Sequence, residues 1–339
     1  MFFGGSFDPP HLGHEEIAKK CKVSTATVSF VINNKNRKGI SVTTWEKIEK
    51  TLSKYKYIKS KKDRSVKRII FCFESSSHLA TTRFLQGIDN DTLFKNEFIF
   101  LFNAILNDLN NLNKIYNKYR PDGIIIATGR TRELDYNISN FNSTNLVLLN
   151  CWSNFFNGIS ILPSDYHSTK KIIKQLINLK KKNIAVILPQ EFAWQNYEDR
   201  LSGWRDAHFE NDMKINSSLL CRPNKNRKYI SEADIGYQAL NKLIRRKVKF
   251  DAIFAMNDFL AMGCYQAAKE KNLNIPKNFS IVGFDNSPIA INLKPALSSA
   301  QLPIAEMTSK SIHHIFNAKN YDENFKIFVN CDLVERNSI

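Results

Sequence analysis

The chain has 339 residues, of which 43% are hydrophobic, so it is long enough for two or three domains and can bury a sizeable core. That composition excludes a mainly disordered chain and a small scaffold stapled by disulfides. The formal net charge is +17, and residues 1–68 alone hold 16 Lys and Arg against six acids, which points to a polyanionic partner for this part of the chain.

The longest apolar runs are strand-sized, far below the roughly 18 residues of a membrane span. The six cysteines are scattered, and no two form a Cys-x-x-Cys pair. The first residues lack the basic flank and long apolar stretch of a signal peptide. The sequence therefore predicts a cytoplasmic protein with reduced thiols, no membrane association, no metal and no cofactor.

Residues 1–14 carry an unusual glycine-, proline- and histidine-rich stretch, Phe3–His14. It resembles the first motif of nicotinate-nucleotide adenylyltransferases, in which glycines let the backbone approach phosphates. His11 and His14 would stabilise charge on the transferring group. The likeness covers only 14 to 20 residues, and no complete catalytic domain follows. We therefore expect an inert fragment and no enzyme activity; an adenylyltransferase-like enzyme is the alternative.

Residues 15–58 show three apolar stripes at helical spacing, which predict three short helices. Ser24 is placed as the N-cap of the second helix. Thr25 and Ala26 then lie at the start of that helix, where a recognition helix meets base edges in the major groove. An ordinary three-helix bundle with a basic, solvated face is the alternative.

This segment resembles the DNA-binding headpiece of the lactose-repressor (LacI/GalR) family through Ile17–Asn33 and onward to Tyr57. The resemblance, together with the polar and basic residue types, gives the predicted DNA-binding residues: Ser24, Thr25, Ala26, Thr27, Ser29, Phe30, Asn33, Lys35 and Arg37. Phe30 stands where many members have Arg, so it offers an apolar contact in place of a bidentate contact to guanine.

Residues 59–67 are almost wholly polar and basic, and they predict a charged linker. Members of the LacI/GalR family usually carry a hinge helix at this place, which wedges into the minor groove. Residues 59–67 lack the sequence pattern of that helix. With Phe30, this departure supports a second alternative, a sugar-binding module whose DNA binding has decayed.

From residue 68 to residue 339 short apolar runs alternate with amphipathic helices, which predicts parallel sheets covered on both faces. The expected strands are 69–73, 98–102, 123–127, 146–150, 184–188, 252–255 and 281–284. The expected helices are 82–94, 105–119, 166–179, 197–209, 231–246 and 259–271.

The same region resembles the effector domain of the LacI/GalR family through Tyr119–Ile126, Arg200–Ala207, Ala255–Gly263 and Ile281–Asn286. The resemblance implies an α/β fold: a periplasmic-binding-protein-like, two-lobed Rossmann-type effector domain, preceded by the small all-α helix-turn-helix headpiece. It also implies a small ligand at the carboxyl ends of parallel strands.

The residues expected to contact this effector are Ser75, Asp165, Arg200, Asn257 and Asp285. Their donors and acceptors suit a sugar or nucleoside rich in hydroxyls. Two alternatives stay open. Arg200 could pair with Asp206 or Glu198 at the surface, and Asp258 could cap a helix.

Together these features predict a LacI-type transcriptional regulator that binds a double-stranded DNA operator as a homodimer, with a small polar effector modulating the binding.

Overall fold

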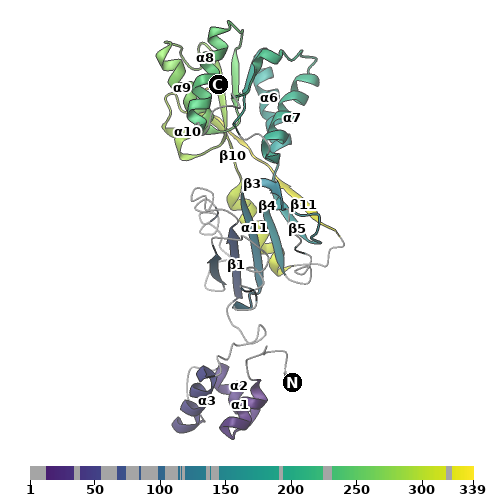
Figure 1. Ribbon diagram of the computed structural model, residues 1–339, viewed down its shortest axis with the longest axis vertical. Coiled ribbons are helices and arrows are strands. Elements are labelled where there is room, and N and C mark those ends of the chain that lie inside the picture. The colour runs from purple at the N-terminus through teal and green to yellow at the C-terminus, as the bar shows by residue number, and fades with distance from the viewer. Residues whose placement is uncertain are drawn as a thin grey trace. The chain divides into compact units, whose positions relative to one another are not determined.

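The computed structural model describes residues 13–33, 39–54, 67–73, 84, 98–103, 114, 116, 119–134, 138, 145–190, 194–223, 231–317 and 323–339. These residues form a three-helix headpiece and two α/β lobes (Figure 1). One compact unit holds the headpiece and parts of β1 (Lys67–Phe73) and β2 (Phe98–Asn103), and a second unit holds nearly all of the remaining lobe residues. The headpiece and the lobes are each described by themselves below.

The headpiece comprises α1 (His14–Cys21), α2 (Thr25–Asn33) and α3 (Val42–Lys54), so the three predicted helices are confirmed. Their apolar stripes meet in a small core of Ile17, Ala18, Cys21, Val28, Val31, Trp45 and Ile48. A core of this size leaves little surplus stability, so the helix caps matter.

Two of the three headpiece helices begin with a side-chain cap. The Oγ of Ser24 accepts a hydrogen bond from the Thr27 backbone N–H at 3.1 Å, which confirms the predicted N-cap of α2. Ser41 caps α3 in the same way, accepting from the Thr44 N–H at 3.2 Å. Gly13 precedes α1 and supplies no side-chain cap. The N-terminus of α1 is therefore the least supported of the three.

The first lobe is built on a six-stranded sheet in the order β2-β1-β3-β4-β5-β11. Its strands are β1 (Lys67–Phe73), β2 (Phe98–Asn103), β3 (Gly123–Glu133), β4 (Leu146–Trp152), β5 (Ile159–Pro163) and β11 (Phe325–Val329). Strands β3, β4, β5 and β11 are parallel neighbours. Helix α11 (Ile304–Phe316) packs on β4 and β5.

The second lobe repeats this order as β7-β6-β8-β9-β10-β12. Its strands are β6 (Ile184–Ile187), β7 (Leu220–Cys221), β8 (Ala252–Ala255), β9 (Ser280–Asp285), β10 (Ser298–Gln301) and β12 (Leu333–Val334). All neighbouring pairs are parallel except β10 with β12. In both lobes the strand order reverses beside the first strand, which is where open α/β sheets bind ligands.

Helices cover both faces of the second sheet, as Figure 1 shows. On one side lie α6 (Asp165–Asn178) and α7 (Gln195–Phe209), and on the other α8 (Glu232–Arg245) and α9 (Asp258–Glu270), with α10 (Pro288–Asn292) and the short η4 (Ser217–Leu219) completing the lobe.

Helices α8 and α9 approach closely at two glycines. A Cβ on Gly236 would lie 1.9 Å from the Leu260 carbonyl oxygen.

The chain passes between the sheets three times, after β5, after β10 and after β11. Hydrogen bonds tie these crossings together. The Ser164 N–H donates to the Val329 carbonyl at 2.8 Å, and the Gln301 N–H donates to that of Asp332 at 2.8 Å. The predicted two-lobed Rossmann-type architecture is therefore confirmed.

Several predicted elements differ in extent. Strand β3 runs six residues beyond its expected end at Ala127, and β5, β7, β10, β11 and β12 were not predicted. The helices expected at 82–94 and 105–119 lie largely outside the described residues, as does the linker 59–66. The six cysteines are free and buried, and no described helix has the length and apolar character to cross a membrane.

Candidate functional site

Arg200 is the centre of a buried polar network in the second lobe. It lies near the start of α7 and is 2% exposed. Its Nε donates to Asp165 Oδ1 at 2.6 Å, and one terminal nitrogen donates to the Met256 carbonyl at 2.5 Å. The other terminal nitrogen lies 3.5 Å from Asp285 Oδ1. The alternative that Arg200 pairs with Asp206 or Glu198 at the surface is wrong.

The Arg200 guanidinium also stacks on Phe284, with its Cζ 3.5 Å from the ring centroid. The next residue, Asp285, has a φ of 96°, so the chain turns sharply as β9 ends. This conformation is strained for any residue but glycine. It holds the Asp285 side chain beside the guanidinium and 27% exposed, so a ligand can reach this carboxylate.

Asp165, at the first residue of α6, keeps one oxygen without a partner. Its Oδ1 binds Arg200, whereas Oδ2 is buried and accepts no hydrogen bond from the described residues. Burial raises the pKa of Asp165 to about 6, although the neighbouring charge of Arg200 lowers it. A buried acceptor that receives no hydrogen bond lowers the stability of the fold. A ligand hydroxyl that donates to Asp165 Oδ2 would therefore bind favourably. Asn196 Oδ1 is a second buried acceptor without a partner.

Asn257 and Asp258 follow β8 and have different roles. Asn257 Oδ1 caps α9 by accepting from the Leu260 N–H at 2.9 Å, which leaves its amide group, 3.5 Å from the Tyr197 hydroxyl, to face the site. Asp258 is fully buried and accepts from the backbone and hydroxyl of Ser287 and from the Ser299 hydroxyl. Asp258 is therefore a structural residue, but it links α9 to Ser287 and Ser299, and the helix cap that was expected at Asp258 is supplied by Asn257.

Four side chains near this network were not predicted from the sequence. Burial raises the pKa of Glu232, while Arg130 and the hydrogen bonds from Asn257 and Tyr197 lower it. The Arg130 guanidinium lies over the rings of Trp194 and Tyr197, at 5.6 and 5.8 Å from their centroids. The only sequence signal was the spacing of Trp194, Tyr197 and Arg200, which are three residues apart around the start of one helix.

Strand β3 continues to Glu133, past its predicted end at Ala127, and this extension brings Arg130 to Trp194 and Tyr197. The register between β3 and β4 shifts between Ala127 and Arg132. Asn150 stabilises the irregularity by accepting from the Thr131 hydroxyl at 2.6 Å and donating to the Thr128 carbonyl at 3.0 Å. A bulge of this kind redirects side chains at the end of a strand.

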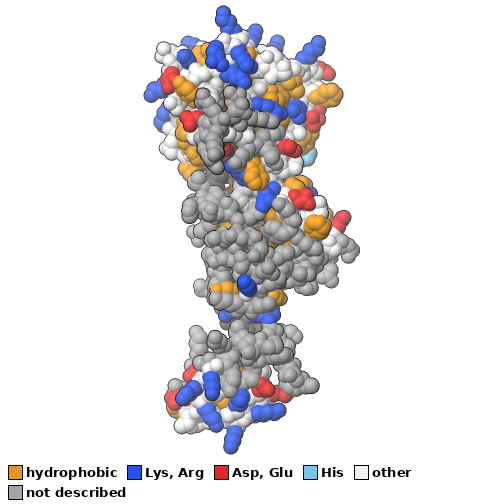
Figure 2. Space-filling view, in the orientation of Figure 1, with side chains coloured by type: hydrophobic (Ala, Val, Ile, Leu, Met, Phe, Trp, Pro, Cys, Tyr) orange, Lys and Arg blue, Asp and Glu red, His pale blue; other side chains and the backbone are white. Residues whose placement is uncertain are grey.

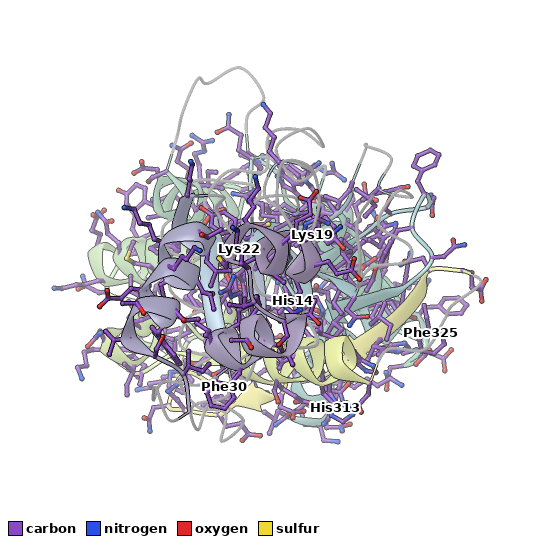
Figure 3. All side chains as sticks on the ribbon, turned by 90° about the horizontal axis from the view of Figure 1, so that it is seen from below. His14, Lys19, Lys22, Phe30, His313 and Phe325 are labelled. Atoms are coloured by element: carbon purple, nitrogen blue, oxygen red, sulfur yellow. The ribbon has the colours of Figure 1, made fainter. Side chains whose placement is uncertain are left out.

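In the headpiece, the predicted base-reading residues are exposed. Ser24, Thr25 and Ala26 lie on the outer face at the start of α2, while Thr27 and Ser29 are half-buried. The hydroxyls of Ser24 and Thr27 are 2.8 Å apart. Lys and Arg side chains gather over this unit, and Lys19 and Lys22 project from α1 and the turn after it (Figures 2 and 3).

Phe30 is half-buried and packs against the headpiece core (Figure 3). Lys35, Arg37 and Ser75 lie outside the described residues, and so does the side chain of Asn33. Within the described part of the chain, no group of three or more His, Cys, Asp or Glu is arranged to hold a metal ion.

Two family models match the chain. Residues 15–60 match "Bacterial regulatory proteins, lacI family", and residues 173–339 match "Periplasmic binding protein-like domain". The first match covers the headpiece helices α1 to α3, and the second covers β6 to β12. Among solved structures, the chain is similar to the lac repressor dimer bound to operator, with a TM-score of 0.66, 18% identity and coverage of 97% of this chain and 99% of the other.

Curated relatives match the chain over nearly its full length. It is 25% identical over 328 residues to the ribose operon repressor of Haemophilus influenzae, covering 93% of this chain and 94% of the relative. It is 25% identical over 340 residues to the transcriptional repressor PurR of Pasteurella multocida, covering 96% and 98%. A regulator from Enterococcus faecium solved with bound ribose gives a TM-score of 0.59 at 21% identity, covering 80% and 98%.

Proposed function

We propose that the chain represses transcription by binding operator DNA through α2 as a homodimer, and that a small polar effector in the second lobe modulates this binding. The single observation that carries the proposal is the buried Arg200–Asp165–Asp285 network at the carboxyl ends of parallel strands, joined to a helix-turn-helix unit in one chain. The relatives named for ribose and the ribose-bound regulator support a sugar-like effector.

The charges at the site favour an uncharged effector. Asp165, Asp285 and Glu232 bring three carboxylates, against the two guanidinium groups of Arg200 and Arg130. Arg200 is already engaged by two of those carboxylates. A phosphorylated sugar would therefore meet carboxylates that repel it, whereas hydroxyls of a sugar or nucleoside could donate to Asp165 Oδ2 and Asp285.

Modulation requires the effector to distinguish two arrangements of the lobes. Arg130 comes from β3 of the first lobe, while Trp194 directly precedes α7 of the second lobe and Tyr197 lies in that helix. Their cation–π contacts lie directly beside the polar network. A ligand that strengthens or displaces these contacts would change the balance between arrangements and thereby DNA affinity.

In the headpiece, the proposed base contacts come from Thr25, Ala26 and Phe30. Contacts to the DNA backbone or to bases are proposed for Ser24, Thr27, Ser29 and Asn33, with Lys35 and Arg37 following. The packing of Phe30 against the headpiece core limits it to an apolar contact at its exposed edge. The proposed domain limits remain 15–58 for the headpiece, 59–67 for the linker and 68–339 for the effector domain.

Residues 1–14 are proposed to be catalytically inert. His14, the last residue of the nucleotidyltransferase-like motif, is the first residue of headpiece helix α1, so the two patterns share one helix. Adenylyl transfer from ATP to nicotinate mononucleotide that is lost in His14→Ala would overturn this proposal.

The DNA-binding proposal is tested by a competition gel shift with the DNA upstream of the chain's own gene. We expect specific retardation that survives an excess of random duplex and weakens steeply with salt. Equal affinity for random duplex would favour the alternative of a sugar-binding module with decayed specificity. A thermal-shift panel of neutral sugars, nucleosides and sugar phosphates tests the effector, and we expect stabilisation by neutral compounds only.

A further inference from the structure

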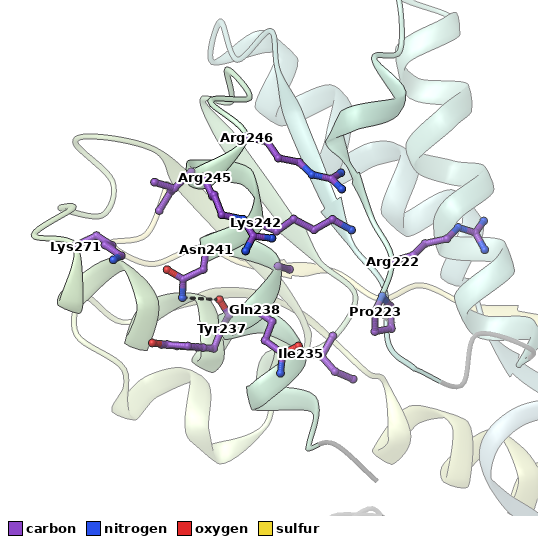
Figure 4. Close-up of a pocket in the computed structure, with 12 residues that line it drawn as sticks. Arg222, Pro223, Ile235, Tyr237, Gln238, Asn241, Lys242, Arg245, Arg246 and Lys271 are labelled. Atoms are coloured by element: carbon purple, nitrogen blue, oxygen red, sulfur yellow. Dashed lines mark hydrogen bonds between the residues drawn. The ribbon is translucent and has the colours of Figure 1, made fainter. Parts of the chain in front are cut away.

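A pocket lies in the second lobe, and none of its lining residues belongs to the Arg200 network. It has a volume of about 780 Å³ and is formed by α8, the residues after β7 and the end of α9 (Figure 4). A pocket of this volume is in the range that small ligands occupy.

Positive charge dominates this pocket. Five of its lining residues are Arg222, Lys242, Arg245, Arg246 and Lys271, and none of the lining residues is an Asp or Glu. Lys242, Arg245, Arg246 and Lys271 form no ion pair with any described carboxylate. Like charges held around one concave surface repel each other, and a bound anion would relieve that repulsion.

Lys242 and Arg246 are four residues apart, so they extend from the same side of α8 toward the strand end that carries Arg222 and Pro223 (Figure 4). Their charges also reach Cys221, the last residue of β7. Burial raises the pKa of that thiol to about 11, and both cations oppose the rise. The two side chains therefore both lie near the end of β7, which leads into the pocket residues Arg222 and Pro223.

The hydroxyl of the lining residue Tyr237 donates a hydrogen bond to Glu270 Oε2 at 2.6 Å. Glu270 forms no ion pair with a Lys or Arg among the described residues. The rest of the lining is apolar or amide, including Ile235, Ile244 and Pro223. Cations beside apolar side chains suit an organic molecule with a charged end.

We propose that this pocket binds a small molecule that carries several phosphate groups. Arginine forks and lysine ammonium groups are the donors that phosphates bind best. Cations from three separate elements suit two or more linked phosphates better than one. This proposal does not rest on the Arg200 site, which favours a neutral ligand.

The test measures binding of inorganic tripolyphosphate and of ATP to the full chain by isothermal titration calorimetry at low salt. Lys242→Gln with Arg246→Gln should weaken both by about thirtyfold or more, because the variant loses two charge-assisted contacts. Neither side chain belongs to the buried core of the lobe, so the variant should fold. Thermal unfolding of the variant checks this. Orthophosphate should bind much more weakly than tripolyphosphate.

Two matched controls remove the same charge elsewhere. Lys214→Gln with Lys277→Gln changes exposed residues of the same lobe, and Lys19→Gln with Lys22→Gln changes the headpiece. Both should retain tripolyphosphate binding, and the pocket variant should retain DNA binding. The proposal is wrong if wild type binds no tripolyphosphate at millimolar concentration, or if the pocket variant binds it like wild type. It is equally wrong if that variant loses only DNA affinity, because the cations would then belong to a DNA surface.

Discussion

Replacing Arg200 by Met tests whether the network in the second lobe is an ion-paired core or a loose surface cluster. Met fills much of the aliphatic volume of Arg but makes none of its hydrogen bonds. The change leaves Asp165 buried with no partner on either oxygen, and it removes the donor to the Met256 carbonyl. Removing one partner of a buried ion pair costs about 3–5 kcal/mol of unfolding free energy, because the remaining charge is left uncompensated.

The pH dependence makes this prediction sharper. The pKa of Asp165 is already about 6 with Arg200 beside it, and Arg200 lowers it. Without Arg200 the pKa of Asp165 rises further, so the carboxyl is neutral at pH 5. We therefore expect Arg200→Met to lose the full amount of about 3–5 kcal/mol of unfolding free energy at pH 8 and clearly less at pH 5. Urea unfolding followed by circular dichroism measures both values.

The double variant Arg200→Met with Asp165→Asn is the control for the single one. It removes the stranded charge as well as its partner, so it should be more stable at pH 8 than Arg200→Met alone. A loss below about 1 kcal/mol in Arg200→Met would show that the ion pair contributes nothing to the fold. A double variant no more stable than the single one would refute the stranded-charge reasoning.

Three further predictions concern the supporting structure. Ser24→Ala removes the cap of α2 and should cost about 1 kcal/mol of headpiece stability and weaken DNA binding, whereas Ser24→Asn should lose little of either; equal losses would contradict the capping role. Gly236→Ala should lower the thermal unfolding temperature, because overpacking against the Leu260 carbonyl costs about 1–3 kcal/mol and outweighs the better helix propensity of Ala. A rise in the unfolding temperature would contradict the close approach of α8 and α9. Burial raises the pKa of Asp258 from 3.8 to about 6, so its contribution to the free energy of unfolding falls as pH rises from about 4 through 6. Between these pH values, the free energy of unfolding in urea should change less with pH in Asp258→Asn than in wild type.

The sequence predicted the elements whose signal is local. Continuous apolar runs located β8 and β9, and the hydroxyl of Ser24 located the start of α2. Strand β10 was missed because its buried residues include Ser298 and Ser299, which hydrogen bonds to other segments satisfy. A buried strand made of serines has no apolar run to reveal it.

The candidate site was predicted only in part for a related reason. Arg200 and Asp285 were expected to contact a ligand, but the identity of the partner carboxylate depends on the fold. Asp165 lies 35 residues before Arg200 and pairs with it because α6 and α7 pack side by side. Arg130 was missed because the polar end of β3 resembles a loop in sequence, and only the pairing with β4 keeps it extended.

The most direct test of the account is the affinity of the full chain for its own upstream DNA, measured by fluorescence anisotropy with and without the neutral compound that stabilises the protein most. The account predicts sequence-specific binding at moderate salt and a change in affinity of at least about fivefold on adding the compound. Asp165→Asn should abolish that change while leaving DNA binding in the absence of the compound intact. Identical affinity for upstream and random duplex, or an affinity that the compound does not alter, would contradict the account.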